Sequence, residues 1–273
     1  MKKFISTLLA IMLVITSVML LPSCQKEESK EEEKAETKTI TIGYTDYAPM
    51  NYEDENGKLV GFDTELAQKM FEELGYEVRF KLIEWSNKYS ELNGGTIDCI
   101  WNGFTANTSD DDGVARSEKV DFSYYYMTNA QCIVKKASDT DITSTAGFEG
   151  KTVAYENGSA AQGYVDGITE NVNKKGVTSQ MDALLSVKAG TADFAVVDIL
   201  LAQSIVGKGD YSSLAINTGL ELEGEYYAVG FKKGSEITAE INKLFIKYAE
   251  NGYLTELAKK YGLENSIITD YTK

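Results

Sequence analysis

Short apolar strands alternate with amphipathic helical stretches along the first part of the chain. Strands are predicted at 40–44, 76–82 and 98–101, and a helix at 63–74 separates the first two of these strands. Asp63 is the expected N-cap of that helix, because aspartate is a favoured residue at helix starts. Strands separated by helices predict a mostly parallel α/β sheet. Ligands of such sheets bind at the carboxyl ends of the strands.

A second α/β series follows farther along the chain. Strands are predicted at 151–155 and 193–198, with helices after the turn at 157–159 and over 179–189. The chain then returns in a strand near 226–231, and two helices finish it. Its 273 residues provide for one large or two medium domains, each with its own core.

One group of candidate binding residues lies between residues 98 and 123. An apolar strand breaks in the turn Asn102-Gly103-Phe104-Thr105, where backbone amides are expected to be free, and Arg116 follows. Amides, a hydroxyl and a guanidinium together form a receptor for a carboxylate. The other arginine, Arg79, is expected on the solvent face of its strand. Alternatively, Arg116 is a surface charge paired with Glu118.

Other candidates stand at the predicted carboxyl ends of strands. Tyr47 is expected to be exposed in a loop, and Trp85 follows the second strand. Ser159 starts a helix, where it either helps to bind an anion or serves only as the N-cap. Asp198 ends a strand and either meets a cation or caps the next helix.

The N-terminus carries the pattern of an exported protein. Lys2 and Lys3 precede an apolar run over 4–21, and Cys24 follows closely. This order is typical of a secretory signal peptide, and a cysteine at the cleavage point resembles a bacterial lipobox, which favours lipidation of Cys24. A transmembrane anchor is the alternative. Residues 25–38, almost all polar or charged, are expected to form a disordered tether.

The composition argues against several classes of function. A net charge of −15 disfavours nucleic acid as a partner. The chain has no histidine and no paired-cysteine spacing, so we expect neither a metal site nor a cofactor. Cys99 and Cys132 lie in apolar stretches and are expected to be buried free thiols, although export would permit a disulfide between them.

Taken together, several short motifs resemble the extracellular solute-binding proteins of amino-acid ABC transporters, family 3. The resemblance covers nearly all of 40–262, and its order and spacing are more specific than any one fragment. The fragments are Tyr47-Ala48-Pro49-Met50, Gly57 to Asp63, Gly95-Thr96-Ile97-Asp98, Asp121-Phe122-Ser123, Gly158-Ser159, Gly190 to Asp193 with Asp198, and Asn251 to Leu254.

The resemblance implies a fold and a set of ligand contacts. The implied fold is α/β, the two-lobed type II periplasmic-binding-protein fold, with two hinge strands near Ala130 and Glu225 and a ligand cleft between the lobes. It also implies that the amides near Gly103 and Thr105, the Thr105 hydroxyl, Arg116 and Ser159 receive the α-carboxylate of an amino acid. Tyr47 would pack on the ligand side chain, and Asp198 would receive the α-ammonium group.

The position of the arginine departs from the family pattern. The family places it about five residues after the threonine of the glycine turn, where this chain has Asp110. Counting back from Asp121-Phe122-Ser123 places Arg116 in register instead, and we favour this count because no other arginine is available. The acidic run 107–113 is then an insertion on the cleft rim, expected to be a solvated loop.

The expected domain organisation has four parts. They are a signal peptide with lipobox (1–23), a lipidated Cys24 with a disordered acidic tether (24–38), a first lobe (39–130 with 226–273) and a second lobe (131–225).

The leading hypothesis is a monomeric, lipid-anchored binding protein outside the cytoplasm that delivers an amino acid to an ABC permease and its ATPase. Trp85, Trp101 and Tyr47 suggest a polar or cationic ligand side chain, with Glu84 as a further candidate, although Trp101 is equally compatible with the core. The alternatives are an enzyme on the same scaffold, similar to cyclohexadienyl dehydratase, or a sensory lipoprotein. The enzyme alternative lacks a recognisable acid–base pair.

Overall fold

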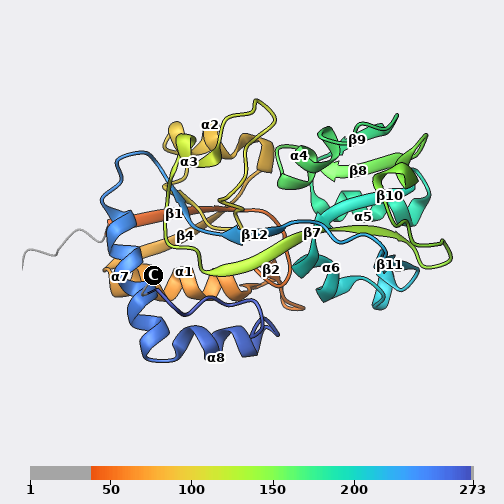
Figure 1. Ribbon diagram of the computed structural model, residues 1–273. Coiled ribbons are helices and arrows are strands. Elements are labelled where there is room, and N and C mark those ends of the chain that lie inside the picture. Colours follow the sequence, from red (N-terminus) through yellow and green to blue (C-terminus); the bar gives the residue numbers. More distant parts are fainter. Residues whose placement is uncertain (1–37, 272–273) are drawn as a thin grey trace, which may run out of the picture. The chain divides into compact units, whose positions relative to one another are not determined.

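The computed structural model describes residues 38–271 and contains two main β-sheets with helices around them (Figure 1). The predicted signal peptide, Cys24 and the predicted tether up to residue 37 lie outside the described residues. Within 38–271, no helix has the length and apolar character needed to cross a bilayer.

The first sheet has the strand order β4-β1-β5-β13-β6. Its strands are β4 (Tyr76–Leu82), β1 (Lys38–Tyr44), β5 (Cys99–Ile100), β13 (Gly230–Phe231) and β6 (Asp121–Phe122). The strand β1 runs parallel to β4 and β5, which confirms the parallel arrangement predicted for these three. The late strand β13 runs antiparallel to β5 and β6 and so brings the end of the chain back to this sheet.

The first sheet lies among helices from both ends of the chain (Figure 1). These elements are α1 (Phe62–Glu73), the 3-10 turn η1 (Trp85–Asn87), α2 (Lys88–Asn93), α3 (Arg116–Lys119), α7 (Ile237–Glu250) and α8 (Tyr253–Lys260), with a small hairpin of β2 (Tyr52–Glu53) and β3 (Leu59–Val60).

Helix α1 shows how the sequence sets this packing. Leu66 and Phe71 belong to its buried face, which packs with Ile42 of β1, and Gly75 follows with a φ of 82°. A glycine tolerates such a φ at a helix end, as predicted. The prediction that Asp63 caps α1 is wrong, because the helix starts at Phe62 and Asp63 is buried within its first turn.

The second sheet has the order β11-β7-β10-β8-β9, and β12 also pairs with β7. Its strands are β7 (Met127–Lys136), β8 (Thr152–Glu156), β9 (Asn173–Val177), β10 (Phe194–Asp198), β11 (Leu214–Ile216) and β12 (Gly224–Tyr227). The accompanying helices are α4 (Ala160–Asp166), α5 (Gln180–Ala189) and α6 (Ile199–Ile205), with 3-10 turns η2 (Thr145–Phe148) and η3 (Gly209–Tyr211).

Strands β7 and β12 connect the two groups of elements. They pair antiparallel, with Ala130 opposite Gly224 and Asn129 opposite Glu225. The later residues of β7 pair with β10 and β11 of the second sheet. Figure 1 shows both strands running from one group to the other, so the protein has two lobes and two hinge strands, as predicted. The residues at which one lobe ends and the other begins stay a prediction.

The largest apolar cluster contains residues of both lobes, such as Phe71 and Leu184, and each lobe also has a smaller cluster of its own. Val153 of β8 packs in one cluster with Val165 of α4 and Val196 of β10, inside the second lobe. Cys99 in β5 and Cys132 in β7 are buried free thiols, as predicted. Burial raises the pKa of both thiols, which keeps them protonated and unreactive.

Candidate functional site

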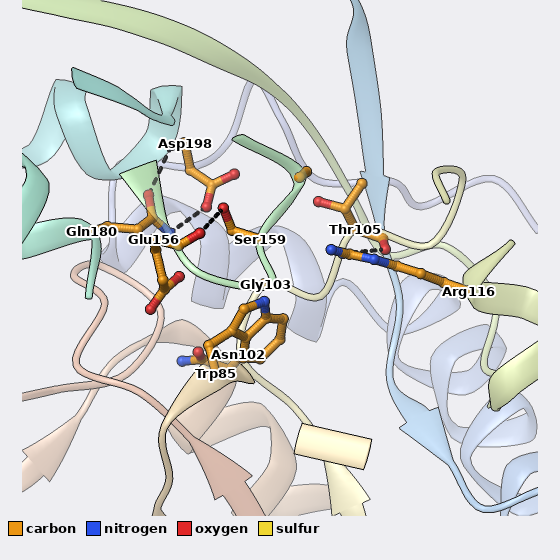
Figure 2. Close-up of a pocket in the computed structure, with 10 residues that line it drawn as sticks. Trp85, Asn102, Gly103, Thr105, Arg116, Glu156, Ser159, Gln180 and Asp198 are labelled. Carbon is orange, nitrogen blue, oxygen red and sulfur yellow. Dashed lines mark hydrogen bonds between the residues drawn. The ribbon is translucent and has the colours of Figure 1, made fainter. Parts of the chain in front are cut away.

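A small cavity lies where residues of the two lobes face each other (Figure 2). It is lined by Trp85, Asn102, Gly103, Thr105, Arg116, Glu156, Ser159, Ala160, Gln180 and Asp198. The structure therefore brings together every predicted ligand-binding residue except Tyr47. Its volume is about 10 Å³, which is space for roughly one water molecule. An amino acid would enter only after the lobes move apart.

The turn after β5 is held in place by a hydrogen bond to Asp63 of α1. Gly103 has a φ of 54°, and its N–H donates to Asp63 Oδ2 at 2.7 Å. A Cβ atom at Gly103 would lie 2.6 Å from the Tyr47 ring and 2.9 Å from the Tyr227 ring, so only glycine fits there. The prediction that the Gly103 amide is free for a ligand is wrong, because this amide already donates to the Asp63 carboxylate in α1.

Asn102 and Thr105 also have partners within the protein. The Asn102 side-chain amide donates to the Thr45 carbonyl oxygen at 2.9 Å and to Asn51 Oδ1 at 2.7 Å. The Thr105 hydroxyl donates to Glu225 Oε2 at 3.1 Å. A ligand carboxylate would therefore share or displace these contacts at the cavity wall.

Arg116 lies at the start of α3, and its side chain is only 1% exposed. Its Nε donates to Asp110 Oδ1 at 2.8 Å, Nη1 to the Thr105 carbonyl oxygen at 3.0 Å, and Nη2 to the Gly158 carbonyl oxygen at 3.2 Å. The guanidinium carbon lies 5.1 Å from the centroid of the Phe104 ring. The surface-charge alternative for Arg116 is thereby excluded.

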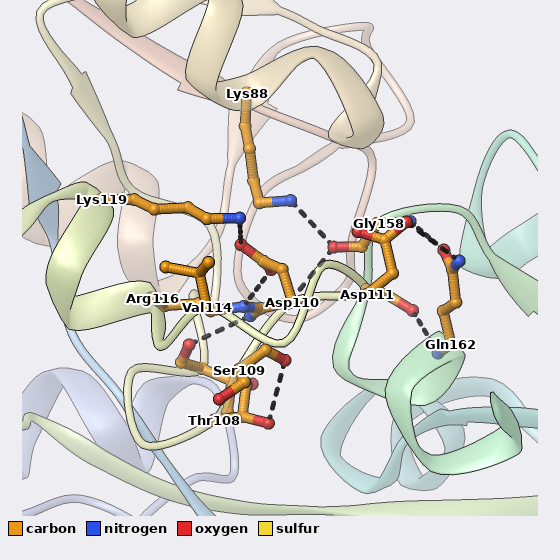
Figure 3. Close-up of polar contacts among 12 residues, drawn as sticks. Lys88, Thr108, Ser109, Asp110, Asp111, Val114, Arg116, Lys119, Gly158 and Gln162 are labelled. Carbon is orange, nitrogen blue, oxygen red and sulfur yellow. Dashed lines mark hydrogen bonds and ion pairs between the residues drawn. The ribbon is translucent and has the colours of Figure 1, made fainter. Parts of the chain in front are cut away.

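Asp110 corrects the prediction for the acidic segment 107–113 (Figure 3). Its side chain is 5% exposed and binds Arg116 and Lys119 rather than solvent. The neighbouring Asp112 is half exposed and also pairs with Lys119. The segment is therefore a solvated loop only in part, and Asp110 belongs to the wall that holds the arginine. Arg79, by contrast, is exposed and pairs with Glu77, as predicted.

Asp198 ends β10 in the second lobe, within a cluster of amide donors. Asn129 Nδ2 donates to its Oδ1 at 2.6 Å, Gln131 Nε2 donates to the same oxygen at 2.8 Å, and Gln180 Nε2 donates to Oδ2. Its side chain makes no hydrogen bond to the start of α6, so the capping alternative is not observed. Burial raises the pKa of Asp198. Burial, and to a smaller extent repulsion from Asp198, raises the pKa of Glu225 to about 7.

Ser159 is the N-cap of α4. Its hydroxyl accepts the N–H of Gln162 at 3.2 Å. The same hydroxyl donates to the Glu156 carbonyl oxygen at 2.7 Å (Figure 2). The capping alternative is therefore observed, and a contact of this hydroxyl with a ligand stays a prediction.

The aromatic candidates separate into cavity and core. Trp85 lines the cavity and packs edge-on against Phe104, with ring centroids 5.2 Å apart. Tyr47 is 1% exposed, and its hydroxyl lies 2.6 Å from the Tyr227 hydroxyl, so the prediction of an exposed ring is wrong. Trp101 is completely buried and belongs to the core. Glu84 is exposed, accepts a hydrogen bond from Asn87 and does not line the cavity.

The model of the bacterial extracellular solute-binding proteins, family 3, matches residues 40–264. The chain belongs to this family.

Curated and structural relatives of this solute-binding protein are amino-acid-binding proteins. It is 27% identical to the arginine-binding extracellular protein ArtP of Bacillus subtilis over 96% of this chain and 98% of that protein. It is 29% identical to the L-cystine-binding protein TcyA of the same organism over 93% and 96%. An ancestral arginine-binding protein bound to arginine superposes with a TM-score of 0.74, at 29% identity over 82% of this chain and 97% of that one.

The family is made of binding proteins rather than enzymes, and it is extracellular or periplasmic. One structural neighbour is related to the enzyme named as the alternative function. An ancestral amino-acid-binding protein, described as a precursor of cyclohexadienyl dehydratase, superposes with a TM-score of 0.72 at 25% identity, covering 82% of this chain and 95% of that one.

Two buried ionisable residues at or near the cavity of this solute-binding protein were not identified from the sequence. Glu156 ends β8 and lines the cavity, and burial raises its pKa to about 8. Lys88 starts α2 and donates to the Gly158 carbonyl oxygen at 2.8 Å, and burial lowers its pKa to about 7. Glu156 has the same signal that identified Asp198, an acid at the end of an apolar strand. Lys88 has none, since a lysine in a short helix is usually exposed.

Proposed function

We propose that this protein is the substrate-binding lipoprotein of an amino-acid ABC importer. It captures a polar or cationic L-amino acid in the cleft between its lobes and delivers it to the permease, which works with an ATPase. It is a monomer, anchored outside the cytoplasm by a lipid on Cys24. The family, the relatives that bind amino acids and the sequence pattern before Cys24 support this proposal.

The observation that carries the proposal is the placement of opposite charges on one cavity. Arg116 and the Thr105 hydroxyl lie on the first-lobe side, and Asp198 lies on the second-lobe side (Figure 2). A carboxylate and an ammonium group on one carbon atom match this arrangement. Nη1 and Nη2 of Arg116 each carry two N–H groups, so the guanidinium has further donors for the carboxylate.

A thermal-shift panel with the full chain, purified in detergent, tests the proposal. The ligands are the standard L-amino acids, cystine and a few amino-acid precursors. A ligand at a hundred times its dissociation constant should stabilise the protein by about 2.7 kcal/mol. One hit or a few hits, lost in Arg116→Ala and in Asp198→Ala, are expected.

Two other outcomes have clear meanings. If no amino acid raises the melting temperature, the proposal fails, and turnover of a precursor would indicate the enzyme alternative. If amino acids bind but the gene lies apart from any permease and ATPase gene, the sensory alternative is favoured over import.

A further inference from the structure

Glu156 is a carboxylate of the cavity that the zwitterion model does not use. It ends β8, directly before the turn that leads into α4, and its side chain points into the region shown in Figure 2 between Asp198 and Trp85. It is only 3% exposed. Ser159, the N-cap of α4, follows three residues later and lines the same cavity.

The carboxylate of Glu156 lacks a protein partner for one of its oxygens. Among residues 38–271, no group donates a hydrogen bond to Oε1, although this oxygen is buried. No lysine or arginine of the described chain lies within ion-pair distance of Glu156. A buried carboxylate without a partner is costly, so native proteins rarely keep one without a use for it.

The two nearby cations are already engaged elsewhere. Arg116 binds Asp110 and two carbonyl oxygens. Lys88 binds the Gly158 carbonyl oxygen, and its Nζ lies 4.7 Å from the centroid of the Tyr89 ring. Both lower the pKa of Glu156, but burial and the charge of Asp198 act in the opposite direction and prevail. Glu156 is therefore short of positive charge inside the site.

We propose that Glu156 receives a positively charged group at the end of the ligand's side chain, so that the ligand is an amino acid with a cationic side chain. This inference rests on the proposed function. Arg116 then binds the α-carboxylate, Asp198 binds the α-ammonium group, and Glu156 binds the third charge. Trp85, on the same cavity, offers a ring face on which an ammonium or guanidinium group packs.

This arrangement discriminates against other side chains. A neutral side chain of the same shape leaves Oε1 of Glu156 without its charged donor, and an acidic side chain adds a negative charge to a site that already contains two buried acids, Glu156 and Asp198. A site built around a buried polar group rejects a ligand that leaves the group unpaired.

Isothermal titration of the full chain in detergent, with matched ligand pairs, tests the inference. The pairs are L-arginine with its neutral isostere L-citrulline, and L-lysine with L-norleucine. Hydrogen bonds to charged groups predict that the cationic member of at least one pair binds roughly 10- to 100-fold more tightly. Glu156→Gln should remove this preference. Glu84→Gln, which alters an exposed acid one residue from Trp85, should retain it.

The outcomes separate the two proposals. If the wild-type protein binds other amino acids but prefers neither cationic ligand, or if Glu156→Gln keeps the preference, the inference about Glu156 is overturned while amino-acid binding stands. If no amino acid binds the wild-type protein, both proposals fail. The comparison within each ligand pair needs no variant, so a folding defect in Glu156→Gln would not leave the inference untested.

Discussion

The two arginines of the chain occupy opposite environments. The Arg79 side chain is 63% exposed and pairs with Glu77 on the edge of β4, whereas the buried Arg116 contacts three different segments of the protein. A guanidinium makes such divergent contacts because its donors are fixed in one plane, and a lysine ammonium group cannot reproduce them. The same chemical change should therefore have very different effects at these two positions.

We expect Arg116→Lys to weaken amino-acid binding by roughly 10- to 100-fold, because the fork-shaped contact with the ligand carboxylate is lost. Arg79→Lys is the matched control and should bind like the wild type. Titration with whichever amino acid is identified measures both. Equal affinity of the two variants would contradict the role proposed for Arg116.

Buried carboxyls with raised pKa values make the stability of the protein depend on pH. Burial raises the pKa of Asp63 and of Glu225 to about 7 and that of Glu156 to about 8, whereas unfolded carboxyls titrate near pH ~4. Between pH 5 and pH 7 the folded protein thus holds protons that the unfolded chain has released. The free energy of unfolding then falls as the pH rises, by at most about 1.4 kcal/mol per pH unit for each carboxyl. We expect a higher melting temperature at pH 5 than at pH 7.

Asp63→Asn should reduce this dependence, because the group that takes up a proton on folding is gone. Asp210→Asn, at an exposed position, should keep the slope of the wild type. The chain has no histidine, so histidine titration does not obscure the measurement. Melting temperatures that rise from pH 5 to pH 7 in the wild type would show that the assignment of these carboxyls is wrong.

At the level of elements, the acidic segment 107–113 combines two kinds of residue. Asp110 is buried against Arg116 and Lys119, whereas Asp111 is exposed and its carboxylate lies 3.5 Å from Gln162 Nε2 of α4 (Figure 3). The segment thus supplies an internal counter-ion for the arginine of the site.

We expect Asp110→Asn to destabilise the protein by about 1–3 kcal/mol, because a charged hydrogen-bond acceptor is lost from a buried pair. Asp111→Asn should change the stability by less than about 0.5 kcal/mol. Denaturant unfolding of the two variants provides the comparison. Two equal and small changes would mean that the whole segment is solvated, as the sequence indicated.

The elements themselves could largely be predicted from the sequence. Alternating apolar residues identified β1 and β4, and the apolar stripe of α1 and its stop at Gly75 were correct. The errors concern side chains whose partners lie far away in the chain. Asp63 binds the amide of Gly103, forty residues later, and a local pattern contains no information about such a partner.

Most residues of the candidate site could be predicted from the sequence, but the hydrogen bonds and ion pairs among them could not. The sequence identified Trp85 and Asp198 by their positions at strand ends and Arg116 by its spacing from Asp121-Phe122-Ser123, and all three line the cavity. It did not reveal that Asp110 binds Arg116, because the same acidic run is equally compatible with a solvated loop. Tyr47 was misjudged because a loop position before a proline suggests exposure, whereas its ring packs beneath the turn at Gly103.

For the molecule as a whole, Gly158 is a point of close contact between the two lobes. Its φ is 75°, and a Cβ atom there would lie 3.1 Å from the backbone Cα of Ser86 and 3.3 Å from Lys88 Nζ, both in the first lobe. Gly150 has a φ of 69° and nothing within 4 Å of its own Cβ position. An alanine is strained by positive φ at both positions, but it obstructs closure only at Gly158.

We therefore expect Gly158→Ala to bind its amino acid more weakly than Gly150→Ala and to have a larger radius of gyration in small-angle scattering with saturating ligand. Both variants should lose a similar amount of stability, about 1–2 kcal/mol. Indistinguishable scattering and affinity for the two would contradict the assignment of Gly158 as the closing contact.

The carbonyl oxygen of Gly158 also has a consequence for the time course of uptake. It accepts hydrogen bonds from Arg116 and from Lys88, two cations of the opposite lobe, and the cavity beside it is too small for an amino acid. Both bonds must break before a solute can enter, so the rate of capture should level off at high solute concentration at the rate of opening. When the solute is scarce, its supply would then depend on how often the cleft opens as much as on how tightly the cleft binds the solute.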